Sequence, residues 1–289
     1  MNPLLFLTFM VPGTVFLGLN DALIKRLLLT GINSQFLLAV NFIAVGVIGL
    51  SLTAVLGMPA LKPGFLSAFA ATVCINIVAQ LCFYRAFERG EASFVSAMRL
   101  VTPPLVLVTG YLVLNEVPTP LGAFGVLTTV AGLWLLVGES FRGISWRDRF
   151  RQPAFLYALA GAVGFAFSFP FDKQAVVASS ALFFVGAGFF LVGVGNLALG
   201  FLIARDRRFF HLPRAALPIF ALSLPVQALG SFLTLQALNY SLAAYAASVK
   251  RLWSFWGVLF SGAILKEKNI GKKLLAVAVM LLGILLTVV

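Results

Sequence analysis

The chain has 289 residues, of which 61% are hydrophobic and 10% are charged. Soluble domains average about 25% charged residues, so this composition excludes a soluble globular protein and predicts an all-α membrane protein with many spans. The net charge of +12 would otherwise suggest a nucleic-acid partner. We expect none here, because loop cations that orient membrane helices explain the excess.

Hydropathy and turn residues predict ten transmembrane helices separated by short loops that carry Gly, Pro, Asn or charge. In chain order they are Leu4–Leu27, Asn33–Gly57, Gly64–Phe87, Ala92–Asn115, Thr119–Gly138, Ala154–Asp172, Ala181–Ala204, Arg214–Leu238, Ala243–Leu265 and Ile270–Val289.

The distribution of Lys and Arg predicts the orientation of these helices. Sixteen of the 21 lie in or beside the loops after the first, third, fifth, seventh and ninth helices, whereas Lys62 and Lys173 lie on the other side. Because Lys and Arg favour cytoplasmic loops, we expect these five loops in the cytoplasm and both termini outside. The predicted location is the bacterial inner membrane, as a multi-pass protein.

The two halves of the chain are related by a shift of 151 residues. The shift superposes Glu116 on Glu267, Gly132 on Gly283 and Ala92 on Ala243. Each half has five predicted helices, an odd number, so the second half enters the membrane inverted. We expect a five-helix repeat at 1–140, a basic connecting loop at 141–153 and a second repeat at 154–289. Inverted repeats are the usual design of secondary transporters, with the substrate near the midplane.

Three cations lie inside predicted spans, where charge is costly and usually functional. Lys250 and Arg251 are about two turns into the ninth helix, and the shift places Arg99 of the fourth helix on Lys250, while Leu100 matches Arg251. Because the repeats are inverted, Arg99 and Lys250 approach the midplane from opposite faces. Together they suit a carboxylate or a phosphate.

Polar residues at helical spacing extend this site. The same shift superposes Asn76 on Gln227 and Gln80 on Ser231, each pair lying i, i+4 on one helix face, and Tyr84 continues the first stripe. The sequence therefore predicts a substrate cavity lined by amides, hydroxyls and the three cations. No acid within a span is an obvious counter-ion for all three, so we expect the substrate to supply the negative charge.

Other interpretations of these charges stay open. Arg99 could snorkel to the headgroups, or a cation could bond backbone carbonyls released by Pro103 and Pro104. Asp21 lies four residues before Lys25, which is typical of an ion pair along one helix. The alternative makes Asp21, with Asn20, a gate or a proton-coupling group.

We predict no catalytic residue, metal site or cofactor. The sequence has no GxSxG or HExxH motif and no paired membrane aspartates, so it does not indicate an enzyme. Cys74 and Cys82 share one apolar segment at a spacing that suggests neither a disulfide nor a metal site. Asp172, which adjoins Lys173, is interpreted as a charge at a loop edge.

The stretches Phe83–Val137 and Leu235–Val289 each show an Ala-rich helix entry, a Glu that closes that helix and a Gly in the last helix. In these features the chain resembles the drug/metabolite transporter superfamily, in particular its EamA-type ten-helix branch. The resemblance covers nearly the whole chain and implies a transporter of small molecules.

A narrower resemblance is to the plastid sugar-phosphate translocators of that superfamily, in which a Lys of the fourth helix and a Lys-Arg pair of the ninth bind phosphate. Arg99 follows a Ser-Phe pair as in those proteins, and Lys250 with Arg251 matches the Lys-Arg pair. A His of the third helix and a Tyr of the eighth helix in those proteins fall near Gln80 and Gln227, where this chain departs from their pattern. The resemblance therefore implies an anionic group on the substrate but not that the substrate is a sugar phosphate.

We therefore predict a secondary-active exporter or exchanger of a small, anionic organic metabolite that works by alternating access. Two alternatives stay open: an EamA-type exporter of amino acids or other zwitterions, and a membrane scaffold or sensor that transports nothing. The expected partners are the small-molecule substrate and the lipid bilayer, with the protein as a monomer or homodimer.

Overall fold

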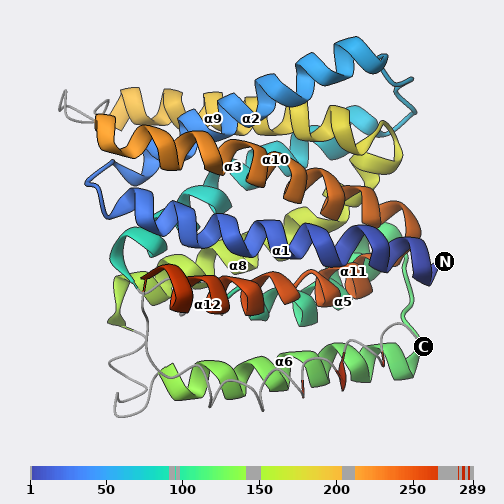
Figure 1. Cartoon of the computed structure of the whole chain (residues 1–289). Coiled ribbons are helices and arrows are strands. Elements are labelled where there is room, and N and C mark those ends of the chain that lie inside the picture. Colours follow the sequence, from blue (N-terminus) through green and yellow to red (C-terminus); the bar gives the residue numbers. More distant parts are fainter. Residues whose placement is uncertain are drawn as a thin grey trace.

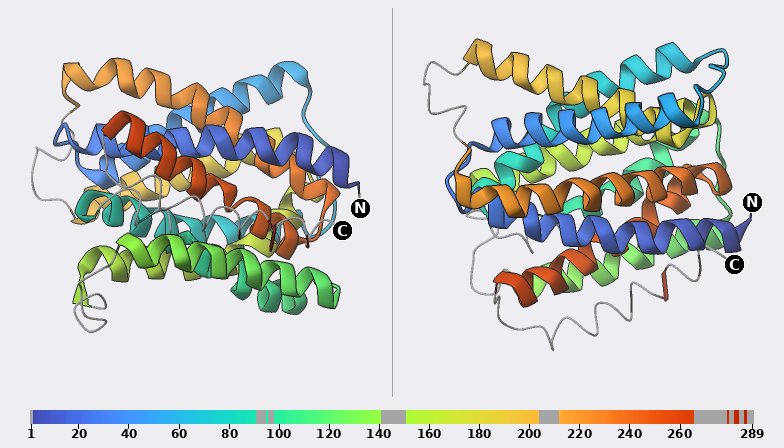
Figure 2. Two further views of the ribbon diagram at one scale, coloured as in Figure 1. Left: turned by 60° about the horizontal axis from the view of Figure 1, so that its bottom comes forward. Right: turned by 45° about the horizontal axis from the view of Figure 1, so that its top comes forward.

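The computed structural model describes residues 2–90, 95, 98–140, 151–203, 212–265, 279, 282, 283 and 286. These residues form a bundle of helices that run roughly side by side (Figure 1, Figure 2). Within this part of the chain, six helical segments are long and apolar enough to cross a membrane. They are α1 (Pro3–Leu28), α2 (Ser34–Leu56), α3 (Phe65–Arg89), α8 (Pro153–Val177), α9 (Ala181–Ile203) and α10 (Leu217–Gln236) with its flanking turns η3 (Arg214–Ala216) and η4 (Ala237–Tyr240).

The predicted all-α membrane fold is confirmed. The fourth predicted helix is described as the turn η1 (Arg99–Val101) followed by α5 (Thr102–Leu114), and the fifth as α6 (Pro120–Ser140). The ninth is divided into α11 (Ala243–Val249) and α12 (Leu252–Leu265). Most of the tenth predicted helix lies outside the described residues, as do residues 141–150, Ala92 and Glu267.

The fourth and ninth helices are interrupted at repeat-related positions. In the fourth, Pro103 has no N–H to donate to the carbonyl of Arg99, and residues 99–101 form a 3-10 turn. In the ninth there is no proline at the break, but Trp253 N donates to the carbonyl of Lys250, three residues earlier, at 3.0 Å. Each interruption therefore lies at a cation that the sequence places inside a span.

Helix α8 does not end at Asp172 as predicted but continues to Val177, although it contains Pro170. Pro170 cannot donate to the carbonyl of Ala166. Thr109 Oγ1 of α5 donates to that carbonyl instead, at 2.8 Å. A side chain from a neighbouring helix thus replaces the lost backbone bond, which is how membrane helices tolerate proline.

The helix contacts follow the repeat. α1 packs against α10 and α12, and its counterpart α8 packs against α3 and α5. α2 packs against its own counterpart α9, and α5 against α11. In Figure 1, α1 begins on the right and α8 begins on the left, as inverted repeats require. The helices of each half pack mainly on the other half, so the centre of the bundle is built from both.

Glycines let α2 and α9 approach closely. A Cβ on Gly186 of α9 would lie 2.6 Å from the backbone nitrogen of Leu50, and a Cβ on Gly49 of α2 would lie 2.7 Å from Gly186 Cα. Neither neighbour is a flexible side chain that could move aside. Small residues of this kind allow the backbones of membrane helices to come together.

Gly186→Ala should therefore force α2 and α9 apart and lower the free energy of unfolding by about 1–3 kcal/mol, the usual cost of overpacking. Gly188→Ala on the same helix is the matched control, because its Cβ would meet no atom closer than 3.6 Å. Thermal unfolding of the protein in detergent compares the two variants. Equal midpoints would contradict this account of the α2–α9 contact.

Candidate functional site

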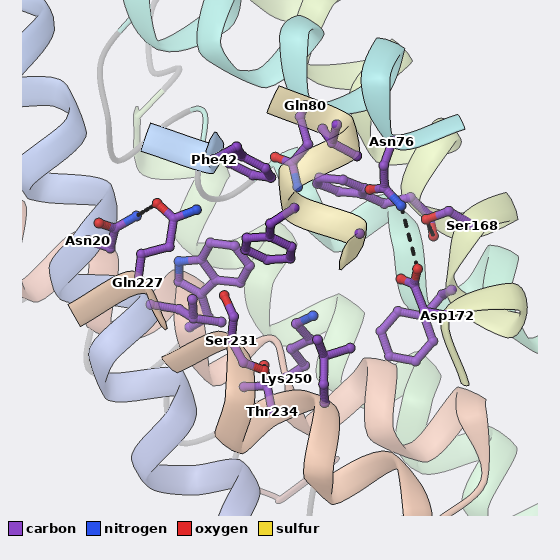
Figure 3. A pocket seen from close by; sticks show the side chains of 18 of the residues that line it. Asn20, Phe42, Asn76, Gln80, Ser168, Asp172, Gln227, Ser231, Thr234 and Lys250 are labelled. Atoms are coloured by element: carbon purple, nitrogen blue, oxygen red, sulfur yellow. Dashed lines mark hydrogen bonds between the residues drawn. The ribbon is translucent and has the colours of Figure 1, made fainter. Parts of the chain in front are cut away.

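A cavity lies between the helices of the two halves (Figure 3). All eight residues predicted to bind the substrate, and both residues considered for a gate or proton coupling, line this cavity. They are Asn20, Asp21, Asn76, Gln80, Tyr84, Arg99, Gln227, Ser231, Lys250 and Arg251. Their predicted roles in binding and gating stay predictions, but the repeat does bring them together.

Amides and hydroxyls line the cavity from α1, α3 and α10. Asn20 Nδ2 of α1 donates to Gln227 Oε1 of α10 at 3.2 Å, and Ser231 lies one turn further along α10. Asn76 and Gln80 lie one turn apart on α3 and line the cavity with them (Figure 3). These groups can donate and accept hydrogen bonds to a bound solute.

Aromatic rings form another part of the wall. Phe42 of α2 stacks on Phe189 of α9, with ring centroids 4.7 Å apart, and meets Tyr84 edge-on at 6.4 Å. All three residues line the cavity, together with Phe165, Phe169, Phe184 and Trp253. A solute in this cavity would therefore contact apolar ring faces as well as polar groups.

Arg99 already has a counter-ion in Asp21, although no acid within a span was an obvious counter-ion for all three cations. Its Nη1 lies 2.5 Å from Asp21 Oδ2, and both side chains are only 4% exposed. The guanidinium also lies over the rings of Trp253, Phe83 and Phe87, at 4.1, 4.4 and 5.4 Å from their centroids. The ion pair and the rings together offset the cost of burying this charge.

Arg251 is 3% exposed, and its hydrogen bonds go to backbone carbonyls. Its Nη1 donates to the carbonyl of Arg99 at 2.8 Å, and its Nε donates to the carbonyl of Ala247 at 3.1 Å. The Arg99 carbonyl is the one to which Pro103, which has no N–H, cannot donate a hydrogen bond. Arg251 therefore connects the interruptions of the fourth and ninth helices, as the alternative of a cation bonded to carbonyls describes.

Lys250 is placed differently from the two arginines. Its ammonium lies 5.4 Å from the ring centroid of Phe169 and 5.9 Å from that of Trp253. Among the described residues this ammonium has neither a hydrogen-bond partner nor an ion pair, and the side chain lines the cavity (Figure 3). Lys250 is thus the cavity cation whose charge is directed at the open space.

Asp172 is a site residue that the sequence analysis missed. It lines the cavity, accepts a hydrogen bond from the Thr72 hydroxyl and lies 3.5 Å from Asn76 Nδ2 (Figure 3). The interpretation as a loop-edge charge is wrong, because α8 continues past it. The 151-residue shift places Asp21 on Asp172, and that match could have identified it.

Two lysines that the shift does not superpose donate to repeat-related carbonyls near the ends of α1 and α8. Lys25 Nζ donates to the carbonyl of Gly90 at 2.8 Å, and Lys173 Nζ donates to the carbonyl of Ser241 at 2.7 Å. The shift places Gly90 on Ser241. Lys173 also forms an ion pair with Glu116. These bonds tie corresponding loops to the two helices that carry Asp21 and Asp172.

Comparison with known proteins identifies the family. The sequence model of the EamA-like transporter family matches residues 4–138 and 152–289. The chain belongs to the EamA-like transporter family. A crystal structure of a protein with 14% sequence identity has a similar fold, with a TM-score of 0.70 over 95% of this chain and 97% of the other. No curated protein matches the chain significantly.

Membership confirms the predicted resemblance and makes this EamA-family protein a multi-pass membrane transporter of small molecules. The family consists of transporters rather than enzymes, in agreement with the sequence analysis. The alternative of a scaffold or sensor without transport is therefore wrong.

The buried pair of Asp21 and Arg99 should dominate the stability of this region. Asp21→Asn or Arg99→Gln alone leaves an uncompensated buried charge, which costs about 3–5 kcal/mol. The double variant removes both charges and should lose much less than the sum of the two single losses. Chemical unfolding of the wild type, the two single variants and the double variant in detergent gives the four free energies of this double-mutant cycle. Additive losses would show that the pair does not act as a unit.

Proposed function

We propose that this EamA-family transporter moves a small organic metabolite with an anionic group by alternating access, and that Lys250 holds that group. The observation that carries the proposal is the Lys250 ammonium, which faces the cavity without a hydrogen-bond partner among the described residues. A charge in such surroundings is costly unless it is paired. A carboxylate or phosphate of the solute would pair it.

The other predicted site residues have supporting roles in this proposal. Arg99 and Arg251 add positive potential, although their hydrogen bonds go to Asp21 and to carbonyls. Asn76, Gln80, Gln227, Ser231 and Tyr84 contact the rest of the solute from both halves of the cavity. Asn20 and Asp21 keep their proposed part in gating or proton coupling, because Asp21 holds Arg99 and Asn20 holds an amide of α10.

We further propose that the two repeats divide at residues 141–153, and that the basic loops face the cytoplasm of a bacterial cell with both termini outside. The support is the distribution of Lys and Arg. The transporter would act as an exporter or exchanger and as a monomer or homodimer.

A second candidate is the export of amino acids or other zwitterions. One observation favours it: Asp172 places a carboxylate in the same cavity as Lys250. An ammonium group of the solute could approach Asp172 while its carboxylate approaches Lys250.

Counterflow in proteoliposomes tests the proposal with three probe classes: monocarboxylates, amino acids and organic phosphates. Lys250→Ala should reduce uptake of the transported class by at least about tenfold, because the pairing charge is lost. Lys62→Ala is the matched control, since Lys62 lies in an exposed loop. Unchanged uptake by the Lys250 variant would overturn the assignment, and preference for amino acids would favour the second candidate.

A further inference from the structure

The two repeats contain the same pair of opposite charges in two different states. The 151-residue shift places Asp21 on Asp172 and Arg99 on Lys250. In the first repeat the pair is closed at 2.5 Å. In the second repeat no ion pair joins the two residues, although they interact electrostatically and both line the cavity. The open pair is one asymmetric feature of the site, and Arg251, whose counterpart is Leu100, is another.

Neighbouring side chains keep the second pair open. The carboxylate of Asp172 is held on the α3 side by Thr72 and by Asn76. The ammonium of Lys250 lies over the rings of Phe169 and Trp253. Figure 3 shows Asp172 and Lys250 reaching into the same space from different helices. A solute in this space would therefore meet one fixed negative and one fixed positive charge.

The charges around the cavity determine which solute it can enclose. Among the described lining residues, two are acidic (Asp21 and Asp172) and three are basic (Arg99, Lys250 and Arg251), so their formal sum is +1. An enclosed cavity of low dielectric is most stable when its charges balance. A solute with one net negative charge balances this set, whereas a dianion leaves an excess negative charge beside Asp172.

We propose that Asp172 is the specificity-determining residue of this transporter, and that it restricts the bound solute to one net negative charge. This inference rests on the proposed function, in which Lys250 holds the anionic group. Asp172 repels the second charge of a dianion, because its carboxylate is held by Thr72 and Asn76 and, unlike that of Asp21, is not closed on a cation of its own repeat. Without Asp172 the described lining would carry +2, which suits a dianion.

A purely structural role for Asp172 has a different signature. Asp172 also joins α8 to α3 through Thr72. If that were its whole contribution, removing the hydrogen bond or the charge would weaken every ligand alike. If the role is electrostatic, removing the charge of Asp172 changes the ratio of the affinities for monoanions and dianions. Removing the hydrogen bond from Thr72 does not change that ratio.

Succinate and its monomethyl ester are suitable probes, because they share a carbon chain and differ by one negative charge at pH 7.5. The affinities of the detergent-purified protein for the two probes can be measured by titration calorimetry. Longer and shorter homologues of the diacid and its monoester can be measured in the same way. The wild type should prefer the monoester. In Asp172→Asn the ratio should shift toward the dianion by about tenfold or more, since one nearby charge is removed.

Two further variants separate the possible outcomes. Thr72→Val removes the hydrogen bond but keeps the carboxylate, so it should leave the ratio unchanged. Gln80→Glu adds a negative charge to the lining and should shift the ratio against the dianion, which tests the idea even if Asp172→Asn does not fold. If the ratio of monoanion to dianion affinity is the same in all these variants, the proposed role of Asp172 is overturned, but the proposed function is not. Failure of the wild type to bind any anion would overturn the proposed function.

Discussion

Burial of charge in a membrane is the constraint on which this site depends, because a cation in a span must find a partner, a carbonyl or a ligand. Arg99 finds Asp21 and three aromatic rings. Arg251 finds the carbonyl of Arg99, at the break that Pro103 produces, and the carbonyl of Ala247. Lys250 is left facing the cavity. The same physical cost therefore accounts for the closed ion pair, for the carbonyl bonds of Arg251 and for the position where we propose that a solute binds.

The inverted repeat supplies two copies of each structural element, and function arises where the copies differ. α1 and α8 each carry an aspartate at the matching position, and the fourth and ninth helices each carry a cation at their interruption. In the first repeat the two charges have closed on each other and hold the structure together. In the second they face a common space. The proposals on Lys250 and Asp172 follow from this difference.

Much of the fold follows from hydropathy, because the spans are long and apolar and their loops carry the polar residues. Six of the ten lining residues were predictable as repeat-related pairs, since a shift that superposes helices also superposes the positions that face their shared centre; Asn20, Asp21, Tyr84 and Arg251 were predicted from their charge, polarity or helical spacing. Asp172 was not predicted, because its helix was expected to end there, whereas the helix continues through Pro170 and Thr109 donates to the Ala166 carbonyl that Pro170 leaves without a backbone partner. The pairing of Arg99 with Asp21 spans 78 residues, and no local pattern encodes such a contact.

The most direct test of the central claim is chemical rescue at position 250. A Lys250→Cys variant, in a background where Cys74 and Cys82 are replaced by Ser, should lose uptake of the transported anion. Aminoethyl methanethiosulfonate should restore uptake, because it returns an ammonium at similar reach, whereas the sulfonatoethyl reagent should not. Bound anion should slow the labelling. Full uptake before labelling, or equal effects of the two reagents, would contradict the claim that a cation at position 250 holds the solute.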